Sequence, residues 1–143
     1  MLRKSWLEVI GGINTFIPPR LATGSETDEM IALLQWATLK SGMHPELSLL
    51  YHIPNEGKRS KATGGMLKAM GLKKGVPDIC LPVARGGYHG LYAEMKVTRG
   101  KPTEEQEKWL LRLAGQGYFT CVCYGWETTA EVIEEYLRGT FGG

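Results

Sequence analysis

The chain has 143 residues, 43% of them hydrophobic and 22% charged, and a formal net charge of +2. This length predicts a single domain that can bury a core, and so small a charge does not by itself indicate nucleic-acid binding. No apolar run reaches membrane-spanning length. Glu8 and Asn14 interrupt any signal-peptide core, so we expect a cytoplasmic protein with no membrane partner.

Residues 1–24 are predicted to form an irregular arm that precedes a single domain over residues 25–143. Pro18-Pro19 stops any helix there. The arm carries more apolar side chains than a small domain usually exposes, which makes it a candidate contact with the domain or with a second subunit. These apolar residues are Trp6, Ile10, Ile13 and Phe16.

The first helix is predicted to begin near Ser25, a good N-cap residue, and to end at Ser41-Gly42. Apolar residues recur at helical spacing between these points. A strand is then expected from Leu47 to Ile53. A second helix is expected from Lys61 to Met70, because Gly71 follows it.

A basic segment without acidic residues surrounds this second helix and directly precedes the acidic residues described next. Such a segment favours a polyanionic partner, although a solvated helix face is an equal alternative. Its six positive residues are Lys58, Arg59, Lys61, Lys68, Lys73 and Lys74.

Asp78, Glu94 and Lys96 lie in two short apolar runs that are predicted to pair as antiparallel strands. Residues two apart on a strand share a face, so Glu94 and Lys96 project together, and the partner strand can bring Asp78 beside them. Two carboxylates and an ammonium can hold a divalent cation and activate a water, which is the chemistry of phosphodiester hydrolysis. The competing interpretation is an ordinary hairpin with solvated charges.

The remaining elements are a helix, a buried strand and a final helix. Thr103 is the expected N-cap of the first, with Gln106 in the position of a capping-box partner. The strand spans Tyr118 to Tyr124 and the last helix Thr128 to Leu137. The order αβαββαβα predicts an α/β fold, with a mixed sheet flanked by helices and one β-α-β crossover near the C-terminus. The three cysteines lie in apolar runs and are expected to be small buried core residues.

The Pro-Asp and Glu-x-Lys pattern resembles the PD-(D/E)XK nuclease superfamily. Around it stand Ile53 to Arg59, Gly71 to Asp78 and, after Lys96, Gln106 and Trp109. With these surroundings, roughly residues 25–138 resemble the VRR-NUC family, virus-type replication-repair nucleases that occur as small stand-alone phage proteins and as domains of repair nucleases. The resemblance implies a restriction-endonuclease-like αβββαβ core and, if a phage encodes the chain, the host cytoplasm.

The resemblance further implies that Asp78, Glu94 and the backbone carbonyl of Met95 bind Mg²⁺, with Mn²⁺ as a substitute. Hard oxygen ligands suit this ion. Lys96 would orient or help deprotonate the attacking water. Gln106 would lie near the site, as well as capping its helix.

The family also places a glutamate of the first helix near the metal. Glu26 and Glu29 both qualify, and Glu26 is favoured because it precedes the apolar run. Substrate phosphate is expected to contact a set of polar and basic residues. These are Asn55, Lys58, Arg59, Lys73 and Lys74.

The function implied is a metal-dependent endonuclease that acts on structured DNA, resembles Holliday-junction resolvases and works as a homodimer. A homodimer matches the two-fold symmetry of a junction. Two alternatives remain open: a non-catalytic DNA-binding subunit that retains the fold, and a nuclease acting on RNA or on duplex ends.

Overall fold

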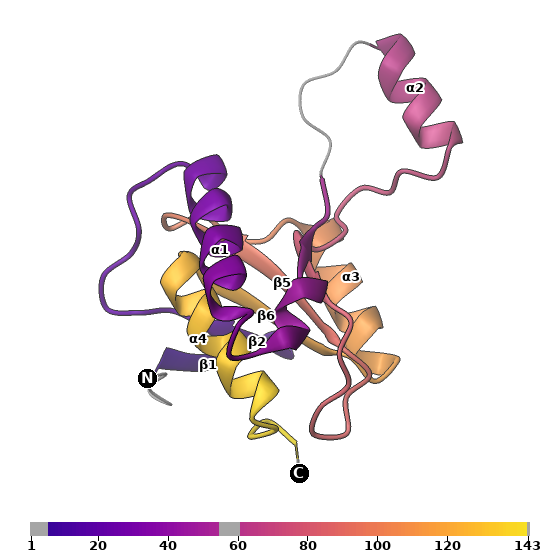
Figure 1. Ribbon diagram of the computed structural model, residues 1–143. Coiled ribbons are helices and arrows are strands. Elements are labelled where there is room, and N and C mark those ends of the chain that lie inside the picture. The colour runs from indigo at the N-terminus through magenta and orange to yellow at the C-terminus, as the bar shows by residue number, and fades with distance from the viewer. Residues whose placement is uncertain (1–5, 55–60, 143) are drawn as a thin grey trace.

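The computed structural model describes residues 6–54 and 61–142. Within them a six-stranded mixed sheet has the order β1-β2-β6-β5-β4-β3 (Figure 1). Its strands β5 and β6 are parallel and are joined through a helix, as the predicted crossover requires, whereas β4 is antiparallel to both of its neighbours. The strands are β1 (Leu7–Ile10), β2 (Ile13–Phe16), β3 (Tyr51–His52), β4 (Ile79–Leu81), β5 (Leu91–Lys96) and β6 (Phe119–Tyr124).

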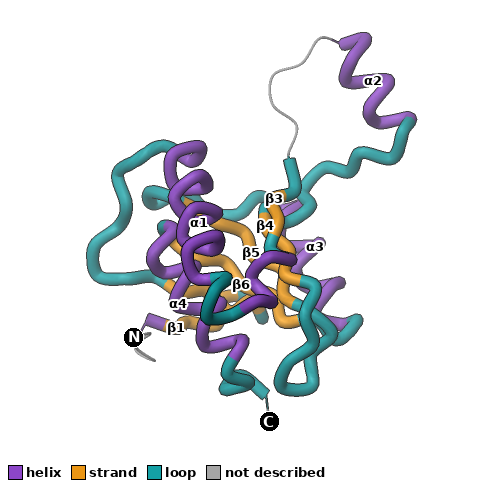
Figure 2. The backbone as a smooth tube through the Cα atoms, in the orientation of Figure 1, coloured by secondary structure: helices purple, strands orange, loops and turns teal. Residues whose placement is uncertain are grey.

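Helices cover both faces of this sheet, which confirms the predicted α/β architecture (Figure 2). Helices α1 (Glu26–Lys40) and α4 (Trp126–Leu137) pack together on one face, and α3 (Glu104–Gly115) covers part of the other. Helix α2 (Lys61–Ala69) stands away from the sheet in Figure 1. No helix in the described ranges is long and apolar enough to cross a membrane.

Local capping signals fix where α1 and α3 begin. The Ser25 side chain accepts a hydrogen bond from the Asp28 N–H, as expected of an N-cap. Thr103 and Gln106 form the predicted capping box, each side chain accepting from the other's backbone N–H. These caps set the position of Gln106 relative to the sheet.

The N-terminal segment is not irregular, contrary to the prediction from its sequence. Residues 7–16 form the hairpin β1–β2, and β2 pairs in parallel with β6. Ile13 and Phe16 are buried in the core of this chain and so cannot serve a second subunit, whereas Ile10 remains half exposed. Gly11-Gly12, both with positive φ, form the hairpin turn and were a local signal for it. Only the pairing of β2 with β6, more than a hundred residues away, lies beyond the reach of local patterns.

The strand predicted from Leu47 to Ile53 is also mostly wrong. Residues Pro45–Leu49 form a 3₁₀ helix, designated η2, and only Tyr51 and His52 remain as β3. Pro45 favours the first position of a helical turn, and the Ser48 hydroxyl closes that turn by donating to the Pro45 carbonyl. A short apolar run alone does not distinguish the two structures.

Alternation along β5 and β6 divides the core into two clusters, one on each face. Ala93, Met95 and the buried, free thiols Cys121 and Cys123 face α1 and α4. Val122 and Tyr124 face the α3 side together with Leu110. By the same alternation, Glu94 and Lys96 project to the α3 side.

Candidate active site

Asp78 and Glu94 lie opposite each other where β4 begins. Ile79 pairs with Ala93 in the antiparallel register, so the next pair outward is Asp78 and Glu94, with both side chains on one face. The Asp78 carboxylate also accepts a hydrogen bond from the Met95 N–H at 3.1 Å. Its backbone carbonyl accepts from the Ile53 N–H and, at 2.9 Å, from the Nδ1 atom of His52. The side chain of Asp78 is therefore fixed by β5, and its backbone carbonyl is fixed by β3 and the residue that follows it.

Glu94 is only 1% exposed, and its Oε1 atom has no hydrogen-bond partner in the described part of the chain. Burial, followed by the hydrogen bond and charge of Asp78, raises the pKa of Glu94 to about 10, while Lys96 opposes the shift. A buried carboxyl oxygen without a partner is costly. The arrangement fits a group that binds a cation.

The Met95 carbonyl is directed toward the same place. The Lys96 carbonyl accepts from the Gly125 N–H on the β6 side, and successive residues of a strand direct their backbone groups to opposite sides. Met95 therefore faces the β4 side, where its N–H reaches Asp78. The register extended from β4 puts Pro77 across from Met95, and proline has no N–H to offer that carbonyl.

Lys96 and Gln106 are in contact. The Lys96 ammonium donates to the Gln106 Oε1 atom at 3.1 Å. The same Oε1 atom accepts from the Thr103 N–H at 2.8 Å, so one side chain both caps α3 and holds the lysine beside Glu94.

The two acids at the start of α1 have different surroundings. The negative charge of Glu26 contributes to the raised pKa of Glu94, which places Glu26 near the carboxylate pair. Glu29 instead accepts a hydrogen bond from the Trp126 N–H at 3.2 Å. It thereby serves the N-terminus of α4, where a negative charge is favoured.

These groups fit a magnesium-type ion better than a structural zinc ion. Over the described residues, no three His, Cys, Asp or Glu side chains gather into a metal-binding cluster. Asp78 and Glu94 contribute two carboxylates, and the Met95 carbonyl can add a third hard oxygen ligand. Mg²⁺ commonly binds through one or two carboxylates and keeps several waters.

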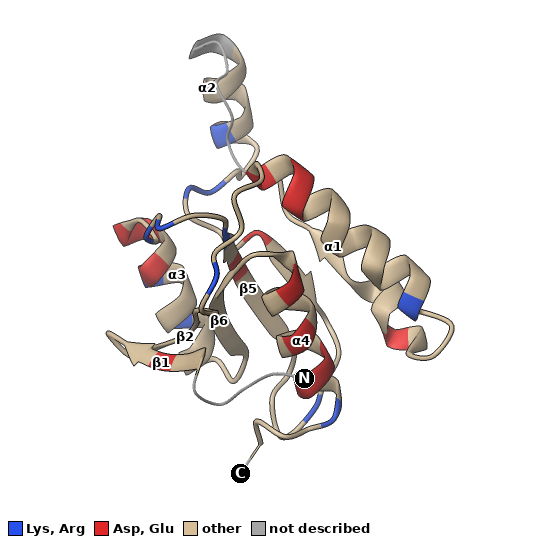
Figure 3. Ribbon diagram, turned by 90° about the vertical axis from the view of Figure 1, so that its left-hand side faces the viewer, with Lys and Arg blue, Asp and Glu red and all other residues tan. Residues whose placement is uncertain are grey.

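Of the predicted phosphate contacts, Asn55, Lys58 and Arg59 lie outside the described residues. Lys73 and Lys74 are exposed in the loop that leads from α2 to β4, and they line a groove of about 540 Å³ along α3. The Trp109 indole borders this groove and donates to the Lys74 carbonyl at 3.0 Å. Figure 3 shows this basic loop passing close to α3.

Two further cations in the groove were not found from the sequence. Lys108 and Arg112 of α3 line the same groove as Lys73 and Lys74. Glu105 is the acid among the lining residues, and Lys108 pairs with Glu104 at 3.4 Å. The spacing of four residues between Lys108 and Arg112, which places both on one helix face, was the available signal. His52 is another residue that the sequence does not single out, because nothing local shows that its ring reaches the Asp78 backbone.

A family model and a solved structure both match this chain. The model of the VRR-NUC domain family matches residues 26–127, from the start of α1 into α4. One solved structure, described as a VRR_NUC domain protein, aligns with a TM-score of 0.70 and 27% sequence identity, over 81% of this chain and 90% of that chain. None of the curated proteins compared with the chain matches it.

Proposed function

The chain belongs to the VRR-NUC family, which indicates a nuclease-like function, and from this premise we propose that it is a metal-dependent endonuclease of structured DNA. The single observation that supports metal dependence most strongly is the buried Glu94 carboxyl. Its Oε1 atom has no partner among the described residues and lies beside a second carboxyl. A binding protein without catalytic activity gains nothing from two carboxylates facing a phosphate.

Asp78, Glu94 and the Met95 carbonyl would hold Mg²⁺, with Mn²⁺ as a substitute. When bound, such an ion lowers the pKa of a coordinated water and neutralises charge on the scissile phosphate. The backbone contacts of Asp78 keep its carboxyl aimed at Glu94. Glu26 adds a negative charge at the rim that favours cation binding.

Lys96 has a separate role in this proposal. Its ammonium projects on the same face as Glu94 and is fixed by Gln106, so it can orient the attacking water and offset charge on the phosphate oxygens. Preorganised cations of this kind stabilise the developing charge of the transition state. Lys96 therefore acts on the reacting atoms without serving as a metal ligand.

The substrate is proposed to be branched DNA, and the active form a homodimer. A small domain with one candidate site makes one cut, whereas resolving a four-way junction takes two related cuts. The edge strand β1 exposes Leu7, Val9 and Ile10, and an unpaired apolar edge favours association. The groove along α3 offers four cations to the phosphate backbone.

One assay tests the proposal and ranks the alternatives. Matched junction, flap, duplex and single-strand DNA, together with an RNA of the same sequence, are incubated with the protein with and without Mg²⁺. The proposal predicts Mg²⁺-dependent cleavage that is fastest on the junction. Binding without cleavage would instead favour a non-catalytic subunit, and cleavage confined to RNA or duplex ends would favour the other alternative.

A further inference from the structure

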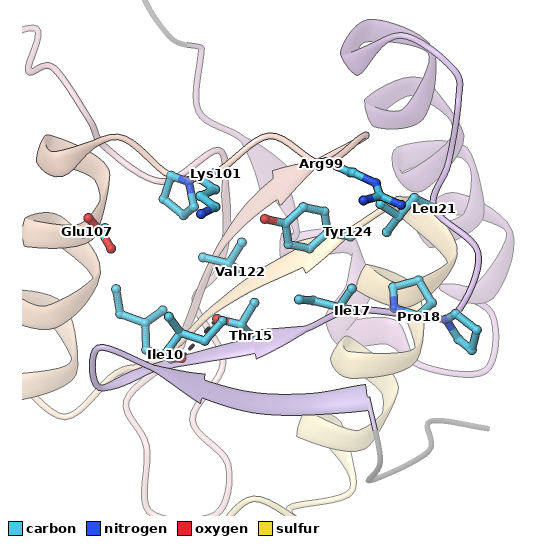
Figure 4. A pocket seen from close by; sticks show the side chains of 13 residues that line it. Ile10, Thr15, Ile17, Pro18, Leu21, Arg99, Lys101, Glu107, Val122 and Tyr124 are labelled. Atoms are coloured by element: carbon cyan, nitrogen blue, oxygen red, sulfur yellow. Dashed lines mark hydrogen bonds between the residues drawn. The ribbon is translucent and has the colours of Figure 1, made fainter.

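A pocket of about 560 Å³ lies beside the candidate active site, between α3 and the hairpin β1–β2. Figure 4 shows Arg99 and Lys101 on one side and Thr15 and Ile17 on the other, with Val122 and Tyr124 between them. The volume is within the range of sites that take small organic ligands. The pocket combines apolar walls with two cations.

The register of the sheet ties this pocket to the active site. Val122 pairs with Glu94 and Tyr124 pairs with Lys96 in the parallel ladder of β5 and β6. Paired residues of neighbouring strands project on the same face, and the strands are about 4.8 Å apart. A DNA strand with a phosphate at Glu94 therefore passes next to the pocket.

The loop that carries the two cations is fastened by Tyr124. Its hydroxyl donates to the Gly100 carbonyl at 2.5 Å, and Gly100 lies in the chain between Arg99 and Lys101. The loop that follows Lys96 is thereby fastened to β6. Glu107 is the one acid among the lining residues, so the cations outnumber it and the pocket mouth favours a negatively charged group.

We propose that this pocket accepts one unpaired nucleobase of the DNA strand being cut, with the adjoining phosphate bound by Arg99 and Lys101. The proposal rests on the proposed nuclease function and names a recognition element for it. A base has flat apolar faces that suit Ile17, Leu21 and the Tyr124 ring, and its phosphate suits the two cations. An unpaired base costs the least to bring out of a stack, so the pocket selects distorted or branched DNA.

The affinity of the protein for DNA, measured in EDTA to prevent metal-dependent cleavage, tests directly whether the pocket binds a base. Three matched duplexes are compared by fluorescence anisotropy: fully paired, with one extrahelical thymine, and with an abasic residue at the same bulge. The thymine bulge is expected to bind roughly tenfold more tightly than the abasic bulge. Ile17→Trp fills the pocket and should abolish this preference, whereas Leu39→Trp, at the exposed end of α1, should retain it.

Removal of the two positive charges at the pocket tests the proposed phosphate contact. Arg99→Ala combined with Lys101→Ala should weaken binding of all three DNAs and lower the slope of log affinity against log salt by about 1–2. Lys40→Ala combined with Arg138→Ala removes the same number of charges at a distance from the pocket. This control should leave both the DNA affinity and the salt slope unchanged.

Equal affinity of the wild type for thymine and abasic bulges would overturn the proposal, as would a preference that survives in Ile17→Trp. If the wild type cleaves DNA with Mg²⁺ but shows no such preference, the pocket assignment fails while the nuclease function stands. If it neither binds nor cleaves DNA, both fail together.

Discussion

The Glu94 carboxyl lowers the stability of the metal-free protein, although the proposed activity requires it as a metal ligand. Its carboxyl is buried with one oxygen unpartnered, next to Asp78. In the metal-free protein this arrangement weakens the fold, because the ionised form has lost its hydration and faces a second carboxyl. Proteins accept such costs at functional sites.

Replacement of Glu94 by Gln should therefore stabilise the metal-free protein, by about 1–2 kcal/mol at neutral pH. The folded-state pKa of about 10 lies above the ordinary value of 4.5. The carboxyl thus destabilises the fold progressively as pH rises from about 4.5 toward 10, and costs nothing below that window. Thermal unfolding of wild type and Glu94→Gln in EDTA should give similar midpoints near pH 4.5 and diverge above it. Identical midpoints at pH 8 would contradict the burial argument.

Lys96→Ala should lower the cleavage rate by about 100-fold or more while metal binding persists. The physical reason is that the ammonium, which donates to Gln106, contributes no ligand oxygen, whereas its proposed role is to orient the attacking water. Calorimetric titration with Mn²⁺ should give nearly the same affinity as the wild type, and Gln106→Ala should show a smaller loss of rate. Loss of metal binding by a folded Lys96→Ala protein would mean that its role is misassigned.

At the scale of elements, local signals explain which parts of the fold were predictable. The caps at Ser25 and Thr103 depend on residues three positions apart, so sequence alone placed α1, α3 and Gln106. The Asp78–Glu94 pairing followed from two strands joined by a short connection. The hairpin β1–β2 was missed although Gly11-Gly12, both with positive φ, mark its turn, whereas the pairing of β2 with β6 has no local signal. The helix η2 was missed because an apolar run fits a strand equally well. The pocket at Tyr124 is lined by residues from 10–21 and 99–124. These ranges are distant in the sequence, so local patterns could not predict it.

Helix α3 and the loop before β4 together form the basic groove, and this predicts a salt dependence. Lys73→Ala combined with Lys74→Ala should lower the slope of log affinity against log salt by about 1–2 on duplex DNA, because each phosphate contact contributes roughly 0.9. Lys40→Ala combined with Arg138→Ala is the charge-matched control. Equal slopes for the two double variants would mean that Lys73 and Lys74 are ordinary solvated surface residues that do not contact phosphate.

At the scale of the whole molecule, one chain offers one candidate site, so paired cutting requires two chains. Light scattering at micromolar concentration should give the mass of a dimer, and a junction labelled on opposing strands should be nicked at symmetry-related positions. Val9→Lys places a charge on the exposed edge of β1 and should weaken the dimer; Leu39→Lys, at the exposed end of α1, is the control. A monomer that cuts one strand only would contradict the resolvase-like part of the account.

The rate of plasmid nicking by Asp78→Asn in Mg²⁺ tests most directly whether Asp78 and Glu94 bind a catalytic metal ion. Asparagine keeps the size of the side chain and removes the charge that a divalent cation needs. We predict a fall of at least about 1,000-fold relative to the wild type, with DNA binding retained, and no nicking by either protein in EDTA. Nicking by purified Asp78→Asn within tenfold of the wild-type rate would contradict the assignment of Asp78 and Glu94 as the metal-binding pair.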